Sequence, residues 1–201
     1  MSEIKFATIG TSKITRTFLS AASNVPEFKL EATYSRNIKN AIEFGTPYNV
    51  TKFYDSLNTL AEDRTIDAVY IASPNVFHCS QAIQMMKAGK HVLCEKSLAS
   101  NKKEAEEMFR TAAENNVILL EAMRPVFDPG MDAVKASLNK LGVIRRATLN
   151  YCQYSSRYDS FLQGQDHNIF SRECSAGALM DIGTYCVHSL LCLFGRPQKV
   201  V

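Results

Sequence analysis

The stretch IKFATIGTSKITRTFLSAA, residues 4–22, decides which fold this chain is expected to adopt. Residues 4–10 form a short apolar run that ends on Gly10, and residues 13–22 follow with the periodicity of a helix. A buried strand that turns at a glycine into a helix is the opening unit of an open α/β sheet.

The same alternation of strand and helix continues to residue 123. Strands are expected at 4–10, 29–35, 51–54, 67–73, 91–95 and 117–123, and helices at 13–22, 38–45, 56–62, 76–88 and 101–115. Most of these strands are nearly continuous apolar runs, which is typical of a parallel sheet covered by helices on both faces. Residues 1–123 are therefore predicted to form a doubly wound α/β domain.

The pattern changes after Arg124, and we expect a second domain over 124–201. Its expected elements are a helix at 128–140, a strand at 142–154, a polar loop at 155–175 and a helix at 177–194. Apolar and polar residues partly alternate along this strand, which predicts a sheet with one packed face and one face that is freer of contacts. The chain stops at QKVV, which looks like the opening of another strand. One strand and such a stub cannot make a sheet, so we expect a truncated α/β domain and a chain that is a fragment of a longer protein.

Composition narrows the class of protein. The 201 residues are 46% hydrophobic and 21% charged, with a net charge of +3 and no block of Lys and Arg, so nucleic acid is not expected as the main partner. We find no signal peptide and no stretch that approaches the length of a membrane span, so no membrane partner is expected. The six cysteines form no C-x-x-C pair and most lie in apolar runs, which favours a reduced, cytoplasmic protein with buried free thiols.

The loop GTSKIT, residues 10–15, is a candidate phosphate site. Of the three glycines of a dinucleotide-binding fingerprint only Gly10 is present, with Ser12 and Thr15 at the other two positions. A pyrophosphate at the N-terminus of the following helix would meet the backbone of Gly10, Thr11, Ser12, Lys13 and Ile14. By itself this signal is weak, because a strand that turns at one glycine is common.

The end of the second expected strand bears on which cofactor binds. An acidic residue there would hold the ribose hydroxyls of NAD, but the sequence has Ser35 and Arg36. The Arg36 guanidinium could pair with the extra phosphate of NADP and stack on adenine, whereas Glu31 lies at the strand's beginning. We therefore expect NADP, with NAD as the second choice; the alternative is a solvated surface arginine.

Three polar residues lie where an apolar pattern would not require them. Lys96 follows the strand expected at 91–95, at the edge of a parallel sheet where ligands bind. Asp181 and Tyr185 are four residues apart on an apolar helix and share one face, with His188 three residues further on. They can be a hydrogen-bonded pair inside a core or part of a catalytic site.

Four motifs together resemble one protein family. The motifs are GTSKIT (10–15), ASPNVFH (72–78), CEKS (94–97) and GALMDIGTYCVH (177–188). They resemble the glucose-fructose oxidoreductase, inositol dehydrogenase and rhizopine catabolism protein family, and most closely its dimeric dihydrodiol dehydrogenase-like branch. The resemblance implies a Rossmann domain, then an α/β domain with a mostly antiparallel open sheet. It also implies NAD or NADP and the oxidation or reduction of sugars, cyclitols and related alcohols.

The resemblance also implies roles for individual residues. The residues that it places at the cofactor are Ser73, Pro74, Asn75, His78, Glu95, Lys96 and Arg124, of which His78 is expected to be structural. It makes Lys96 and Asp181 site residues and puts Tyr185 where other branches carry a catalytic histidine. Two departures are Ser97, where the family has a proline that can hold a cis bond, and Ala176, where it has a glycine. Because of Ser97 we expect Lys96 to be held less rigidly.

These observations lead to a hypothesis of hydride transfer, with Tyr185 as general acid and base, Lys96 tuning it, and Asp181 positioning substrate or lysine. A small sugar or polyol would be the substrate, and the full-length protein is expected to be a homo-oligomer, a dimer or tetramer. One alternative is a non-catalytic NADP-binding regulator on the same fold. Another is a metal-dependent hydrolase or lyase that uses Asp181 and His188, for which no third ligand is evident. His167 could touch substrate or be a surface residue.

Overall fold

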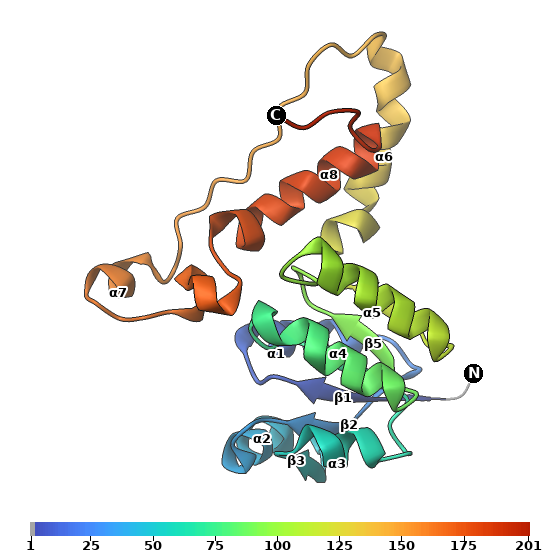
Figure 1. The fold of residues 1–201 in the computed structure, drawn as a ribbon, viewed down its shortest axis with the longest axis vertical. Helices are drawn as coiled ribbons and strands as arrows, with labels where there is room; N and C mark the ends of the chain where they lie inside the picture. The colour runs from blue at the N-terminus through green and yellow to red at the C-terminus, as the bar shows by residue number, and fades with distance from the viewer. Residues whose placement is uncertain (1–2) are drawn as a thin grey trace. The chain divides into compact units, whose positions relative to one another are not determined.

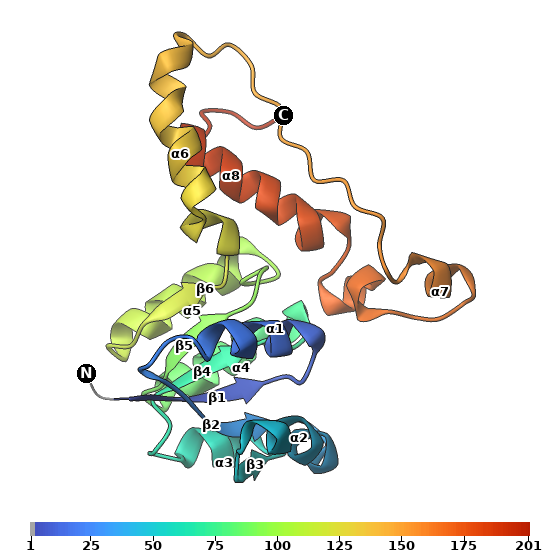
Figure 2. The ribbon, with the colours of Figure 1, turned by 180° about the vertical axis from the view of Figure 1, so that it is seen from behind.

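A parallel sheet of six strands in the order β3-β2-β1-β4-β5-β6 organises the first half of the chain (Figures 1 and 2). It is seen in a computed structural model that describes residues 3–201. The strands are β1 (Ile4–Ile9), β2 (Phe28–Tyr34), β3 (Lys52–Tyr54), β4 (Ala68–Ile71), β5 (His91–Cys94) and β6 (Leu119–Glu121). The strand order reverses at β1, which lies between β2 and β4, and ligands of open α/β sheets bind beside such a reversal.

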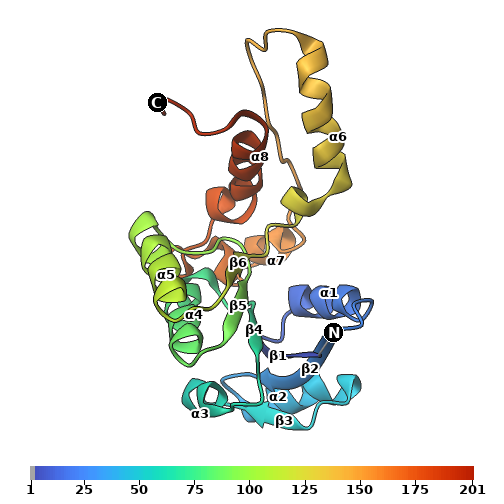
Figure 3. The same ribbon diagram turned by 90° about the vertical axis from the view of Figure 1, so that its right-hand side faces the viewer.

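Helices cover both faces of this sheet. They are α1 (Lys13–Ala22), α2 (Ile38–Gly45), α3 (Leu57–Glu62), α4 (His78–Lys87) and α5 (Lys102–Glu114). Figure 3 shows α1 and α2 on one face and α3, α4 and α5 on the other. Each strand and helix expected before residue 123 is present, and the doubly wound fold is confirmed.

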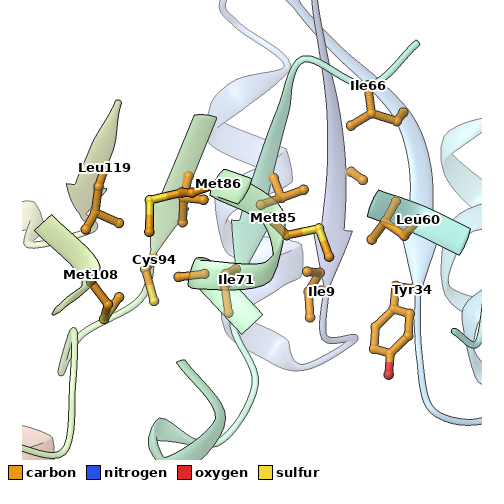
Figure 4. Packing of buried hydrophobic residues seen from close by; sticks show 14 of the residues in the cluster. Ile9, Tyr34, Leu60, Ile66, Ile71, Met85, Met86, Cys94, Met108 and Leu119 are labelled. Atoms are coloured by element: carbon orange, nitrogen blue, oxygen red, sulfur yellow. The ribbon is translucent and has the colours of Figure 1, made fainter. Parts of the chain in front are cut away.

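The core lies between the sheet and the helices α3, α4 and α5. Met85 and Met86 of α4 and Met108 of α5 are fully buried, as are Ile71 of β4 and Cys94 of β5 (Figure 4). Strands that are buried on both faces need apolar side chains in both directions, which explains their nearly continuous apolar sequences.

A polar network fixes the β3 edge of the sheet. The Asp63 carboxylate accepts hydrogen bonds from Tyr54 Oη at 2.7 Å and Lys52 Nζ at 3.0 Å on one oxygen, and from the backbone N–H of Thr65 at 2.9 Å on the other. Burial would raise the pKa of Asp63, but these hydrogen bonds outweigh it and hold that pKa well below its usual range. Burial together with the bond to Asp63 raises the pKa of Tyr54 to about 12. The ionised carboxylate therefore stabilises this edge.

The chain divides into two compact units, Met1–Ala122 and Met123–Val201. The helices of the second unit are η3 (Arg124–Phe127), α6 (Pro129–Leu138), η4 (Asn139–Leu141), α7 (Tyr158–Leu162), η5 (Asn168–Phe170), η6 (Arg172–Cys174), the π-helix η7 (Leu179–Gly183) and α8 (Thr184–Phe194). In the described part of the chain no residue after Met123 is buried.

The strand expected over 142–154 is wrong for this structure. The segment has no regular secondary structure and runs as an unpaired trace in Figures 1 and 2, and residues 198–201 likewise form no strand. A strand needs a neighbour for its N–H and C=O groups, and residues 123–201 supply none. No antiparallel sheet is therefore seen in the second unit as far as the structure describes it.

The statement that no stretch approaches the length of a membrane span needs correction, whereas the expectation of no membrane partner is not contradicted. The run Arg172–Phe194 has 23 residues and a mean hydropathy of 1.4 over its most apolar window, enough by length and composition alone to cross a membrane. Within it, Ser175 and Gly177 have φ values of 53° and 110°, which interrupt the helix. One such run is weak evidence for a span.

We expect the variant Asp63→Asn to lower the free energy of unfolding at pH 7 by about 2 kcal/mol, because an amide cannot replace the charge-assisted hydrogen bonds. A carboxyl whose pKa is lowered by folding contributes stability above its unfolded pKa of about 3.9 and loses that stability as the pH falls through the folded pKa. The difference between the two proteins should therefore shrink as the pH falls below about 4.

Urea unfolding at pH 7, 4 and 3 measures this difference. Glu62→Gln is the matched control, because Glu62 is the exposed carboxylate next to Asp63 and should change the stability by less than about 0.5 kcal/mol at each pH. An Asp63→Asn loss that stays constant down to pH 3 would contradict the assignment.

Candidate functional site

The turn after β1 is shaped by the close approach of two backbones. Gly10 has a φ of 114°, and a Cβ atom on it would lie 2.7 Å from the carbonyl oxygen of Ala72, in the turn after β4. No side chain fits there, so a glycine is required by conformation and by space. The turns after β1 and β4 thereby lie in backbone contact.

The N-terminus of α1 follows this turn without a cap from its own side chains. Ser12 is the N-cap residue, its side chain makes no capping hydrogen bond, and the first turn carries no acidic residue. Ser12, Lys13 and Ile14 are exposed and Thr11 is half-buried. N–H groups at a helix N-terminus attract anions, and the residues here are suited to hold a phosphate group.

Arg36 follows β2 at the same edge of the sheet. It is exposed, and its guanidinium carbon lies 5.8 Å from the centre of the Phe77 ring, in η2 (Asn75–Phe77) after β4. The backbone N–H of Ser35 donates to Tyr54 O at 3.0 Å and so fixes the preceding residue. A guanidinium and an aromatic ring side by side offer one charged group and two flat surfaces to a nucleotide.

His78 joins two turns from inside the molecule. Its ring is fully buried, with Nε2 at 2.9 Å from Ser73 O and Nδ1 at 2.8 Å from Ser97 O. Burial lowers the pKa of His78, and the two carbonyl contacts and the charges of Glu95 and Glu121 oppose that change. The ring therefore connects the turn after β4 to the turn that carries Lys96.

Glu95, directly after β5, is held by a tyrosine of the neighbouring strand. Tyr70 of β4 is fully buried, stacks on Phe18 with ring centres 3.9 Å apart, and donates its hydroxyl to Glu95 Oε1 at 2.6 Å. The backbone N–H of Lys96 donates to the other carboxylate oxygen at 3.3 Å. The Glu95 side chain thus ties the start of the turn to the centre of the sheet.

The next two residues of the turn are anchored as well. The peptide bond between Lys96 and Ser97 is cis, and Ser97 is buried. Besides the contact of Ser97 O with His78, the backbone N–H of Leu98 donates to Glu121 Oε1 at 2.9 Å. A serine led us to expect a looser hold on Lys96, but contacts with His78 of α4 and Glu121 of β6 hold the backbone that follows it.

In the second unit, Tyr185 lies in a pocket of about 390 Å³. Its ring meets that of Tyr151 edge to face, with ring centres 5.3 Å apart and planes inclined at 76°. The lining residues are Arg124, Pro125, Leu149, Asn150, Tyr151, Tyr185, Cys186 and Ser189. Arg124, expected at the cofactor, therefore lies beside the candidate catalytic tyrosine.

Asp181 lies in the π-helical turn η7, just before Tyr185 in α8, and its backbone N–H donates to Gly177 O at 2.8 Å. The single α-helix expected over 177–194 is thus an α-helix preceded by a π turn, a feature frequent at functional sites. Asp181 and Tyr185 belong to the second unit, whereas Lys96 belongs to the first.

Two other candidates remain weaker. In the described residues no group of three His, Cys, Asp or Glu side chains is arranged to hold a metal ion. His167 pairs through Nε2 with Ser160 Oγ of α7 at 2.7 Å. Its ring is therefore already engaged within the polar loop.

Four residues at these places were not singled out from the sequence: Tyr70, Phe77, Glu121 and Tyr151. Glu121 carried a usable signal, because it is the one charged residue in the strand expected at 117–123, near the sheet edge that also carries Lys96. The others look like ordinary core or surface aromatics in the sequence.

The fold and the sheet edge define a dinucleotide-binding protein of the Rossmann class. Residues 4–123 match the GFO_IDH_MocA family, described as an oxidoreductase family with an NAD-binding Rossmann fold. The match covers more than half of the chain, so the chain belongs to this family and the resemblance seen in the motifs is confirmed.

Two curated relatives and one solved structure illustrate the relationship. The chain is 49% identical over 197 residues to scyllo-inositol 2-dehydrogenase (NADP(+)) IolU of Bacillus subtilis (strain 168), across 98% of this chain and 60% of that protein. It is 29% identical over 201 residues to trans-1,2-dihydrobenzene-1,2-diol dehydrogenase of Mus musculus, across 98% and 59%. KijD10, a 3-ketoreductase from Actinomadura kijaniata solved with NADP and TDP-benzene, matches with a TM-score of 0.79 at 27% identity, across 96% and 58%.

The chain thus spans about 60% of the length of the curated relatives that it matches. The similarity nevertheless runs through both units, because it extends over 98% of this chain.

We expect Gly10→Ala to be much more destabilising than Gly89→Ala. Gly89 has a φ of 79° and no atom within 4 Å of an added Cβ, so its substitution carries only the backbone cost, about 1–2 kcal/mol of unfolding free energy. At Gly10 the clash with Ala72 O is added, and the loss should exceed about 3 kcal/mol. Denaturant unfolding of both variants measures the difference, and equal losses would show that the contact with Ala72 is not tight.

Proposed function

We propose that this protein is an NADP(H)-dependent oxidoreductase that acts on a hydroxyl or carbonyl carbon of a sugar, cyclitol or related alcohol. The observation that supports this most strongly is the sheet edge where the Gly10 turn, Arg36 and the anchored Lys96 turn come together. The relatives support the substrate class, since one is named as a scyllo-inositol dehydrogenase and one as a dihydrodiol dehydrogenase.

The residues at this edge fit a dinucleotide phosphate. Gly10 lets the turn after β1 pack against the backbone of Ala72, and the first turn of α1 has no carboxylate to repel a pyrophosphate. Arg36 stands where an NAD-selective site has an acidic residue, and the exposed guanidinium suits a 2′-phosphate. Glu31 does not compete for this role, because it pairs with Lys29 at 3.4 Å and Lys52 at 3.7 Å.

When bound, the cofactor would supply the hydride chemistry, and the protein's side chains would handle the proton. Tyr185 would exchange the proton of the substrate hydroxyl through its Oη, from a pocket in which Tyr151 holds its ring. Lys96 would orient that hydroxyl and favour proton loss from Tyr185, because a nearby ammonium stabilises a phenolate. Asp181 would position the substrate or the lysine.

The six cysteines support a location in a reducing compartment. All six are free, and Cys152 is exposed. Exposed free thiols persist where disulfides are kept reduced, so we propose that the protein works in the cytoplasm.

We expect wild-type protein to bind NADPH more tightly than NADH, and Arg36→Gln to raise the Kd for NADPH by about 10–100-fold, the equivalent of one or two charge-assisted hydrogen bonds. Affinity for NADH should change little. Fluorescence titration measures both constants.

Arg64→Gln is the control for Arg36, because Arg64 is exposed and precedes β4, at the opposite end of the strands. It should leave both constants unchanged. Wild-type preference for NADH, or equal effects of the two variants, would overturn the role of Arg36.

We expect Tyr185→Phe to lower kcat by about 10²–10⁴-fold, since the proton-transfer group is lost while the ring that packs on Tyr151 remains. Turnover of NADP⁺ with a panel of cyclitols and sugars is the measurement. Tyr158→Phe removes a half-exposed hydroxyl of α7 in the same unit and should leave kcat unchanged. Full activity of Tyr185→Phe would disprove the assignment.

A further inference from the structure

The segment that carries Lys96 has no regular secondary structure. It runs from the end of β5 at Cys94 to the start of α5 at Lys102. A lysine side chain has four rotatable carbon–carbon bonds, so its ammonium group reaches a defined place only if the backbone from which it starts is fixed as well. What holds this backbone therefore decides how accurately Lys96 is aimed.

Glu121 is one of the groups that hold the backbone of this turn. The proposed chemistry gives Glu121 no role. It is the last residue of β6, paired in register with Cys94 of β5, so its side chain begins beside the strand that leads into the turn. Its Oε1 accepts the backbone N–H of Leu98, two residues after Lys96, at 2.9 Å. An edge strand thus reaches across to the turn through one carboxylate.

His78 holds the same peptide unit at its other polar atom, the carbonyl oxygen. The carbonyl of Ser97 points to Nδ1 of the fully buried His78, at 2.8 Å. One peptide unit, from Ser97 O to Leu98 N, is therefore gripped at both polar atoms, by α4 through His78 and by β6 through Glu121. A peptide plane held at its carbonyl and at its N–H cannot rotate about its own axis.

We propose that Glu121 is a positioning residue for Lys96. Glu121 and His78 together fix the peptide plane between Ser97 and Leu98. The inference rests on the proposed role of Lys96, and it assigns a role to Glu121, which the proposed function does not use. The acceptor oxygen is what matters, because the hydrogen bond runs to a neutral backbone N–H.

The first test compares two substitutions at one position. Glu121→Gln keeps an oxygen where Oε1 lies, and kcat should stay within about threefold of wild type, because the retained acceptor preserves most of the bond. Glu121→Leu has a similar volume and no acceptor, and kcat should fall by about 10²-fold, the effect of a catalytic group displaced by about 1 Å. The Kd for NADPH should stay within about threefold in both, which separates mispositioning from a collapsed cofactor site.

The second test asks whether Glu121 acts through Lys96. If it does, Glu121→Leu should add no further loss of kcat in a Lys96→Met background, since the lysine that it positions is gone. Independent losses that multiply in the double variant would overturn the proposal. So would Glu121→Leu with normal kcat, or Glu121→Gln as damaged as Glu121→Leu.

Hydrogen exchange provides a readout that does not depend on activity. The Leu98 amide should exchange about tenfold faster or more in Glu121→Leu than in wild type, and at nearly the wild-type rate in Glu121→Gln. If Lys96→Met alone proves fully active, the proposed function of Lys96 fails. The exchange rates then still decide whether Glu121 holds the turn, and an unchanged Leu98 rate in Glu121→Leu would refute that hold.

Discussion

The backbone contact between Gly10 and Ala72 is the constraint on which the first unit's site depends. β1 lies between β2 and β4, and the order of the sheet reverses there, which is the place where ligands of open α/β sheets bind. The 2.7 Å that would separate an added Cβ from Ala72 O shows how near the turns after β1 and β4 come. A side chain at residue 10 would push them apart and displace the turn that leads into the helix N-terminus.

The same edge collects polar groups that would be costly if they lacked partners. Tyr70, His78 and Ser97 are buried and have polar partners: Tyr70 donates a hydrogen bond to Glu95, and the two ring nitrogens of His78 face the carbonyls of Ser73 and Ser97. Burial of such groups is tolerated because the bonds offset desolvation. The result is a turn whose direction is set by contacts with β4, β6 and α4, although it belongs to no strand or helix itself.

Much of this could be predicted, because the signals are local. Apolar runs of strand length and glycine turns gave the six strands and five helices of the first unit, and the position of Lys96 after β5 gave its place at the edge. Tyr70 and Glu121 could not be assigned in the same way, since their partners Glu95 and Leu98 lie 25 and 23 residues away and only folding brings them together. The π turn at Asp181 escaped prediction because one π turn before an α-helix is too short to change the apolar pattern of the segment.

The sequence by itself determined the doubly wound fold, the family and the candidate residues Gly10, Arg36, Lys96 and Tyr185, because periodicity and motifs depend on residues that are near one another in the chain. Only the tertiary structure decided how the Lys96 turn is held and that residues 142–154 form no strand. Both depend on partners from elsewhere in the chain. A strand forms only beside another strand, and a turn outside regular secondary structure takes the direction that its distant neighbours give it.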